Sequence, residues 1–196
     1  MKFKESELAH KYCKGTGIEI GPAAHNPFNI PGCKNLRPRD REEFWEKSQM
    51  DMCGEVSEID MYGDAENIPV ESGSLDYIIS SHVIEHVPNP IKAFTEWNRC
   101  LKKGGIMFMI FPKRDADAMD VGRELSTLES LISQYKDPQP LTDAERHIWV
   151  FDLNSMMDII DYCNMEKLIN WQYVFAFETD DKAGNGHECI ARKYDE

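Results

Sequence analysis

The stretch GDAENIPVESGSLDYIISSHVIEHVPNPIKAFTEWNRCLKKGG, Gly63–Gly105, determines how the rest of the chain is interpreted. Within it, Leu75–Ile79 is a short apolar run bounded by turn residues, which is typical of a strand buried on both faces of a parallel sheet. From Pro90 onward the apolar residues recur with helical spacing, and Gly104-Gly105 is expected to end that helix. The stretch therefore predicts one strand and one helix of an α/β fold.

Polar side chains gather just beyond the carboxyl end of this predicted strand. They are Ser80, Ser81, His82, Glu85 and His86. Open α/β sheets bind their ligands at the carboxyl ends of the strands, so these residues are expected to form half of a ligand site. The other half must come from elsewhere in the chain.

Composition narrows the class of protein. The chain has 196 residues, 41% of them hydrophobic, which predicts a single domain over residues 1–196. A formal net charge of -13 would repel polyanions, so neither nucleic acid nor an anionic membrane is an expected partner. The segment MKFKESELAH lacks the apolar core of a signal peptide, and six cysteines without a C-x-x-C pair are typical of reduced thiols. We therefore expect a cytoplasmic protein.

The segment GTGIEIGPAAHNPF contains glycines in the wrong order for a dinucleotide-binding loop. Gly15 and Gly17 precede the apolar residues, whereas a dinucleotide loop follows its strand, so a nicotinamide-dependent enzyme is disfavoured. We interpret Gly17–Ile20 as the first strand, with Glu19 near its end, and Gly21–Ala24 as the turn. Small residues in that turn let a ligand approach the backbone closely.

The remaining elements are expected at eight places. They are a helix over Ser6–Tyr12, strands over Cys33–Arg37 and Val56–Asp60, a helix at REEFWEKSQ, a strand at IMFMIF, a helix near Asn154–Cys163, and strands over Lys167–Phe177 and Glu188–Lys193. Asp40 lies about twenty residues beyond Gly21, where doubly wound folds present an acid to ribose hydroxyls. A helix-capping role before Glu42 explains Asp40 nearly as well.

The polar segment 113–150 is too long for an ordinary connection, so we expect a lid or a substrate-binding region. Ser126 with Glu129 forms a capping-box pattern ahead of an apolar helix face, and Thr142 with Glu145 predicts a second capped turn. The histidine, cysteine and acidic residues of the chain show no metal-ligand spacing, so no metal is expected.

Together these motifs resemble those of the class I S-adenosylmethionine-dependent methyltransferases, in particular the type 11 group of small-molecule methyltransferases. GDAENIP, LDYIISSHVIEHVPNP and LKKGG occur in that group in this order and at this spacing. IEIGPAAHNPF resembles the first motif in a divergent form, and RHIWVFDLNSMMDII resembles a later substrate-side segment. The resemblance implies a Rossmann-like three-layer sandwich with a mostly parallel seven-stranded sheet. Its implied strand order is 3-2-1-4-5-7-6, with the last strand antiparallel and a helical insertion after strand 5.

The resemblance also implies S-adenosylmethionine as cofactor, S-adenosylhomocysteine as product, and a role for each matching residue. The implied cofactor-binding residues are Glu19, Gly21, Pro22 and Ala23 at the methionine end, Asp40 at the ribose hydroxyls, Asp64 and Ala65 at the adenine, and Ser80, Ser81 and His82 under the sulfonium. Glu85 and His86 would face the methyl acceptor, and His147 is the third candidate catalytic residue. The implied partner is a small-molecule acceptor, bound by a monomer or homodimer.

Two alternatives remain open at this point. His86 and His147 fit either a base or substrate contact or a hydrogen-bonded structural histidine. The first motif carries Pro22-Ala23 where the group has a second glycine, and Pro22 lacks a backbone donor. A non-catalytic protein that binds S-adenosylmethionine or a partner with the same fold is therefore the second hypothesis.

Overall fold

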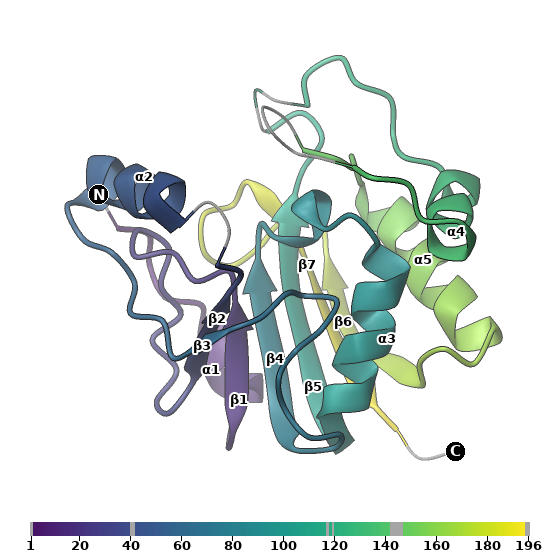
Figure 1. The fold of residues 1–196 in the computed structure, drawn as a ribbon, viewed down its shortest axis with the longest axis horizontal. Coiled ribbons are helices and arrows are strands. Elements are labelled where there is room, and N and C mark those ends of the chain that lie inside the picture. The colour runs from purple at the N-terminus through teal and green to yellow at the C-terminus, as the bar shows by residue number, and fades with distance from the viewer. Residues whose placement is uncertain (1, 40–41, 117, 119, 142–146, 195–196) are drawn as a thin grey trace.

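A computed structural model of the chain describes residues 2–39, 42–116, 118, 120–141 and 147–194. Its strands are β1 (Gly17–Ile20), β2 (Lys34–Arg37), β3 (Met61–Tyr62), β4 (Leu75–Ser81), β5 (Leu101–Pro112), β6 (Trp171–Phe177) and β7 (Gly186–Lys193). They form one sheet in the order β3-β2-β1-β4-β5-β7-β6, in which β7 runs antiparallel to both of its neighbours. The expected strand order and the antiparallel last strand are confirmed (Figure 1).

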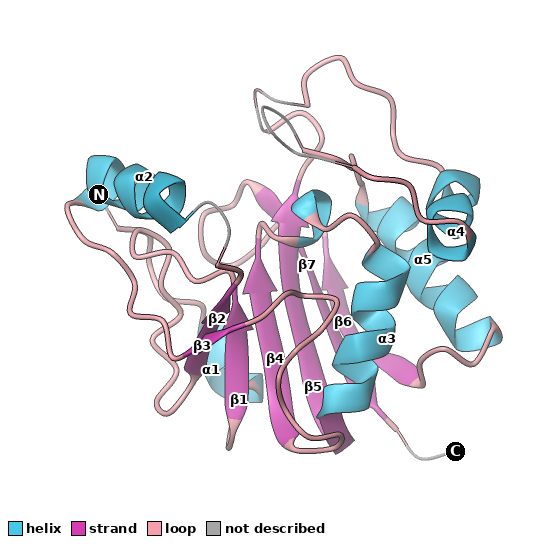
Figure 2. Cartoon of the chain, viewed as in Figure 1, coloured by secondary structure: helices cyan, strands magenta, loops and turns pink. Residues whose placement is uncertain are grey.

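The helices surround this sheet (Figure 2). They are α1 (Glu7–Tyr12), α2 (Glu42–Cys53), the 3-10 turn η1 (Ile84–His86), α3 (Pro90–Cys100), α4 (Leu128–Lys136) and α5 (Leu153–Met165). The helix α4 is the expected helical insertion after β5. No helix in the described part of the chain is long and apolar enough to cross a membrane, and all six cysteines are free thiols.

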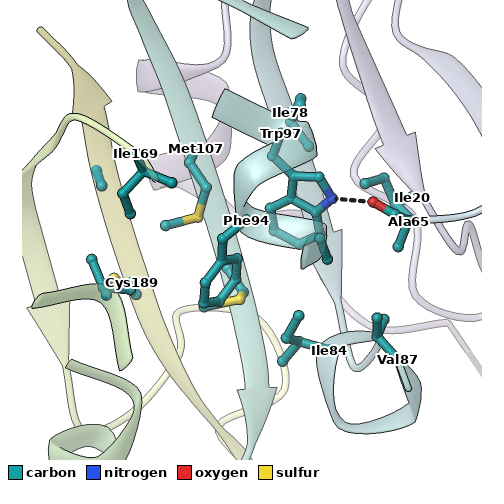
Figure 3. Close-up of a cluster of buried hydrophobic side chains, with 14 of the residues drawn as sticks. Ile20, Ala65, Ile78, Ile84, Val87, Phe94, Trp97, Met107, Ile169 and Cys189 are labelled. Carbon is teal, nitrogen blue, oxygen red and sulfur yellow. Dashed lines mark hydrogen bonds between the residues drawn. The ribbon is translucent and has the colours of Figure 1, made fainter. Parts of the chain in front are cut away.

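The two faces of the sheet are covered very differently. Figure 1 shows α3, α4 and α5 against one face, where Phe94 and Trp97 of α3 are fully buried (Figure 3). The other face is covered by the short helix α1 and by the irregular chain after β1, through Phe28 and Ile30. Residues 21–33 are all described and contain no helix. One outer layer of the sandwich is therefore thin beside β1.

Several predicted boundaries were wrong, and hydrogen bonds explain why. The predicted strand Val56–Asp60 is not a strand; the chain pairs only at β3, because the side chains of Asn35 and Asp60 take up backbone groups before it. The helix α3 ends at Cys100 rather than at Gly104-Gly105, since Leu101 already pairs with Leu75 in the sheet.

Two other boundaries moved for similar reasons. Ser126 does not cap α4: Thr127 is the N-cap and accepts from the backbone of Ser130, while Ser126 Oγ accepts from the Val150 N–H at 3.0 Å. The strand β6 begins four residues later than predicted, at Trp171, because the backbone of Leu168 still bonds back to α5. Thr142 and Glu145, the predicted second capped turn, lie outside the described residues.

Candidate active site

Glu19 is the acidic residue at the end of β1, and it is buried with 8% of its surface exposed. Burial raises the pKa of this carboxyl to about 7, and the nearby charge of Lys182 opposes the shift. Burial also lowers the pKa of Lys182 to about 8, while Glu19 opposes that shift. The strand thus presents a carboxyl group that a cationic ligand would help to ionise.

Gly21 follows β1 in the left-handed conformation, with a φ of 67°. A Cβ at this position would lie 2.6 Å from Val83 Cγ2, so no larger residue fits here. The sequence predicts a glycine here for close approach of a ligand; in the structure the close neighbour is the protein itself, from the segment after β4. Gly21 therefore lets the turn after β1 pack closely against the segment after β4.

The first-strand turn, residues 21–28, is held by side chains from distant segments. Gln49 of α2 accepts from the backbone of Ala24 at 2.7 Å. Lys182, from the loop between β6 and β7, donates to the carbonyls of Asn26 and Pro27 at 3.1 and 2.7 Å. These bonds fix the turn without a following helix.

A cavity of about 250 Å³ opens beside this turn. Three of the predicted cofactor-binding residues, Glu19, Pro22 and Ala23, line it. The cavity is polar and carries the buried Glu19 carboxyl, which suits a cationic group. Gly21 is not among its lining residues, and neither are the predicted residues of β4.

The 63–70 loop contains the predicted adenine-binding residues. Asp64 is exposed and Ala65 is buried. Trp97 Nε1 donates to the Ala65 carbonyl at 3.0 Å, which fixes the backbone of the loop on α3 (Figure 3). Asp40, the predicted ribose ligand, lies outside the described residues, so its role stays a prediction.

The carboxyl end of β4 carries the predicted sulfonium-side residues. Ser80 is fully buried, and its Oγ has no hydrogen-bond partner among the described residues. Ser81 Oγ accepts from Asn26 Nδ2 at 3.1 Å, which joins β4 to the first-strand turn. His82 has a φ of 53°, an unusual conformation for a non-glycine residue, and its backbone donates to Ile110 at 2.9 Å. This strained residue turns the chain into η1.

The three predicted catalytic residues come together. One potential ligand atom from each of Glu85, His86 and His147 lies within 4.8 Å of the others. The rings of His86 and His147 meet edge to face, with centroids 4.8 Å apart. Glu85 and His147 are buried, whereas about a quarter of the His86 side chain is exposed. The cluster therefore has one accessible side.

Backbone bonds hold the 147–150 segment on η1. The N–H groups of Ile148 and Trp149 both donate to the Glu85 carbonyl, at 2.9 and 3.1 Å. Trp149 Nε1 donates to the Val87 carbonyl at 2.9 Å. His147 is thus brought to Glu85 and His86 by its own neighbours in sequence.

A buried carboxylate orients His147. Asp120 Oδ2 lies 2.7 Å from His147 Nδ1, and Asp120 is 1% exposed. Arg123 Nη1 donates to the other oxygen of Asp120 at 2.9 Å and to the His147 carbonyl at 2.8 Å. A carboxylate at Nδ1 favours the tautomer with its proton there, and leaves the lone pair on Nε2.

A larger cavity of about 560 Å³ lies beyond the end of β5. It is lined by Lys113, Arg114, Asp115, Ala116 and Leu125, together with Asp152, Glu178, Thr179 and His187. None of the predicted site residues lines it. Its first five lining residues belong to the 113–150 segment that the sequence indicated as a substrate region.

Sequence reasoning missed three residues that build the site: Gln49, Asp120 and Lys182. Each acts on a partner far along the chain, so no local pattern marks it. A lone polar residue, whether it lies in a helix as Gln49 does or in a loop, gives no signal for a contact that only the fold creates. The grouping of Glu85, His86 and His147 was likewise invisible as a metal-ligand spacing, because His147 arrives from a different segment.

Comparison with known proteins bears on this geometry. A family model described as "Methyltransferase domain", of the type 11 group, matches residues 33–109. Residues 33–109 therefore carry the similarity to the type 11 methyltransferases. This methyltransferase segment contains β4, η1 and α3, with Asp64, Glu85 and His86, and the resemblance drawn from these motifs is confirmed. It begins after the first-strand turn, so the divergent first motif lies outside it.

Curated relatives match shorter pieces of the chain. A demethylmenaquinone methyltransferase of Staphylococcus haemolyticus is 40% identical over 47 residues, 24% of this chain. An uncharacterized 37.1 kDa protein in a transposon of Streptomyces fradiae is 36% identical over 58 residues, 30% of this chain. The matches span only 20% and 17% of these relatives' lengths.

Solved structures share the fold over nearly the whole chain. A SAM-dependent methyltransferase of Thermotoga maritima superposes with a TM-score of 0.54 at 20% identity, over 96% of this chain and 92% of that one. A SAM-dependent methyltransferase of Methanosarcina mazei gives a TM-score of 0.53 at 14% identity, over 100% of both chains. The family and the fold together imply S-adenosylmethionine as cofactor and S-adenosylhomocysteine as product.

Proposed function

We propose that the chain is an S-adenosylmethionine-dependent methyltransferase that acts on a small or medium-sized metabolite. The observation that carries the proposal is the cluster of Glu85, His86 and His147 at the carboxyl end of β4. Glu85 and His86 lie inside the matched methyltransferase segment, and backbone hydrogen bonds hold the residues after His147 on it. A buried carboxylate and two imidazoles beside a ligand-binding sheet edge are suited to handling a proton on a methyl acceptor.

The chain's own residues fit the cofactor. The cavity beside the first-strand turn offers the Glu19 carboxyl to a cation, with Pro22 and Ala23 beside it. Asp64 and the backbone of Ala65 would bind the adenine, Asp40 the ribose, and Gly21 would shape the turn. Ser80, Ser81 and His82 would lie under the sulfur. When bound, S-adenosylmethionine supplies a methyl group on a cationic sulfur, an already activated leaving group.

Methyl transfer then depends mainly on positioning and exclusion of water. The acceptor's attacking atom must lie in line with the methyl group, and a base is needed only if that atom carries a proton. His147, oriented by Asp120, is suited to take that proton, with His86 and Glu85 beside it. The 113–150 segment, which lines the larger cavity, would bind the rest of the acceptor.

The setting of this activity follows from composition. The strongly acidic chain suits a small-molecule acceptor better than a nucleic acid or a membrane surface. We propose a cytoplasmic enzyme in which residues 1–196 form a single domain and act as a monomer or homodimer. The second hypothesis, a non-catalytic protein that binds the cofactor, predicts binding without turnover.

Calorimetry with S-adenosylmethionine and S-adenosylhomocysteine tests the proposal first. We expect binding at millimolar ligand or below, weakened about tenfold in Asp64→Ala, since one polar contact to the adenine contributes about 1.4 kcal/mol. The control is Asp158→Ala, an exposed aspartate of α5, which should leave binding unchanged. No binding to the unaltered protein contradicts the proposal, and equal weakening in both variants contradicts the adenine contact.

A further inference from the structure

Glu85, His86 and His147 form a side-chain set that is typical of a metal centre. A carboxylate and two imidazoles supply one potential ligand atom each, all within 4.8 Å of one another. With metal–ligand bonds of about 2.0–2.2 Å, ligand atoms of a tetrahedral site lie about 3.4 Å apart, so the side chains must close by up to about 1.4 Å.

The buried residues that hydrogen-bond to His147 are the second observation, and it is independent of the first. Asp120 is buried and lies 2.7 Å from His147 Nδ1, with Arg123 on its other oxygen. Metal-binding histidines commonly donate their second ring N–H to a carboxylate, which fixes the tautomer and makes the ligating nitrogen more basic. The Asp120–His147 pair has this arrangement, with the carboxylate at Nδ1.

A fourth group stands beside the cluster. His82 Nδ1 lies 3.8 Å from a Glu85 oxygen, the same separation as His86 Nε2 from that oxygen. His82 is held there by its left-handed backbone conformation. A site with three protein ligands and one accessible side keeps a fourth coordination position open, as catalytic metal sites do, whereas a fourth protein ligand would leave room for another group only in a five-coordinate ion.

We propose that Glu85, His86 and His147 bind one divalent first-row transition-metal ion of the zinc type, with His82 beside it. Two imidazoles favour zinc, cobalt, nickel or iron over magnesium and calcium, which prefer oxygen ligands. This deepens the proposed function and rests on it for the role of the ion: the open position would take the acceptor's oxygen, sulfur or nitrogen.

A metal ion at this site would activate a methyl acceptor that carries a proton. A metal-bound hydroxyl or thiol loses its proton more readily than the unbound group, and the proton passes to water. The acceptor atom keeps its electron pair and becomes the nucleophile that methyl transfer requires. The acceptors expected are therefore ones with an ionisable O–H, S–H or N–H group, and His147 acts as a metal ligand rather than as the base.

A cobalt titration tests the metal site without any methyl acceptor. The protein is stripped with EDTA, and Co²⁺ is added while its visible absorption is recorded, followed by competition with Zn²⁺. We expect one equivalent bound, with affinity at least about 100-fold lower in Glu85→Gln and His147→Ala, and about 10–100-fold lower in Asp120→Asn. His10→Ala, on α1 behind the sheet, is the histidine control and should bind as the unaltered protein does.

Two further measurements keep the outcomes separate. Thermal unfolding of each variant identifies loss of affinity caused by misfolding, and a misfolded variant is replaced by His86→Ala. Calorimetry with S-adenosylmethionine on metal-stripped protein measures the proposed function independently of the ion. Absence of stoichiometric Co²⁺ binding by the unaltered protein overturns the metal proposal, as does equal binding by the cluster variants and His10→Ala. In that case the Asp120–His147 pair is left as a general base.

Discussion

The two loops assigned to the cofactor are held in place by different means. The 63–70 loop is tied to one neighbouring helix, α3. Trp97 Nε1 donates to the Ala65 carbonyl, Glu96 accepts from the Ile68 N–H at 2.7 Å, and Arg99 donates to the carbonyls of Ile68 and Val70 at 3.0 and 2.9 Å. All three side chains lie on the helix that completes the same motif in sequence.

The first-strand turn has no such helix. Its bonds come from Gln49 of α2, from Ser81 at the end of β4 and from Lys182 in the loop between β6 and β7. The Lys182 ammonium also lies 3.7 Å from the centre of the Phe28 ring. Residues 21–33 contain no helix, and contacts between distant segments hold the turn instead. The turn should therefore be the more easily loosened of the two.

The largest expected effect on stability comes from a change at the 63–70 loop. Trp97→Ala should lower the free energy of unfolding by about 3–5 kcal/mol, because it empties a fully buried site and frees the Ala65 carbonyl. Chemical denaturation measures it. Phe94→Ala, one turn earlier and also fully buried, is the matched control.

Cofactor affinity separates the role of Trp97 in the 63–70 loop from its role in the core, when Trp97→Phe is compared with Phe94→Ala. Trp97→Phe keeps most of the burial but removes the N–H that holds Ala65, so it should weaken S-adenosylhomocysteine binding. Phe94→Ala should not weaken it beyond its effect on folding. If Trp97→Phe binds as tightly as the unaltered protein, α3 does not position this loop for the cofactor.

Gln49→Ala should have the next largest effect, now on the first-strand turn. Gln49 Oε1 accepts from the backbone of Ala24 at 2.7 Å and of Ser57 at 3.1 Å, and the residue is buried. Loss of both bonds should cost about 2–3 kcal/mol of stability. Thermal or chemical unfolding reports it, and Met50→Ala, an exposed neighbour on α2, should be close to neutral. Equal effects of the two changes would mean that α2 does not hold the turn.

Lys182→Met should cost about 1–2 kcal/mol, because the ammonium gives up its bonds to Asn26 and Pro27 while the methionine still packs on Phe28. It should also weaken cofactor binding. Lys193→Met is the matched control, since Lys193 donates in the same way to the carbonyls of Asn98 and Leu101, beside the start of β5. A comparable loss of stability without loss of cofactor affinity is expected there; loss in both would remove the special role of Lys182.

The same contrast explains what the sequence could predict. The strand β4, the helix α3 and the grouping of Glu85 and His86 follow from motifs whose parts lie close together in the chain, where periodicity and turn residues are informative. The strand order came from the family resemblance that these motifs carry. Even there, Gly104-Gly105 did not end α3, because strand pairing of Leu101 overrode the glycine signal.

The first-strand turn and the cluster of Glu85, His86 and His147 depend on contacts between distant segments. Lys182 meets the turn across most of the chain, and Asp120 meets His147 from an irregular segment. No local pattern encodes such a contact, since a lone lysine or aspartate in a loop is usually solvated. His147 was named as a candidate, yet its neighbours and its buried carboxylate become visible only in the fold.

Glu19→Gln gives the sharpest test of the first-strand turn, because its effect depends on pH. Burial raises the folded-state pKa of Glu19 to about 7, above its ordinary value of 4.5. Between these values the folded protein binds more protons than the unfolded chain, so Glu19 makes stability fall as pH rises from about 4.5 to about 7. Glu19→Gln should remove that slope and gain stability relative to the unaltered protein above pH 7.

Cofactor binding should show the opposite trend with pH. The cationic cofactor favours ionised Glu19, so binding below pH 7 must release a proton, and affinity should rise by up to about tenfold per pH unit until the pKa is passed. Calorimetry at pH 6 and pH 8, in buffers of different ionisation enthalpy, counts that proton. Glu188→Gln is the control, because burial also raises the pKa of Glu188 to about 7, yet Glu188 does not line the cavity. If proton release persists in Glu19→Gln and disappears in Glu188→Gln, the cationic group of the cofactor binds beside Glu188 on β7 and not at the first-strand turn.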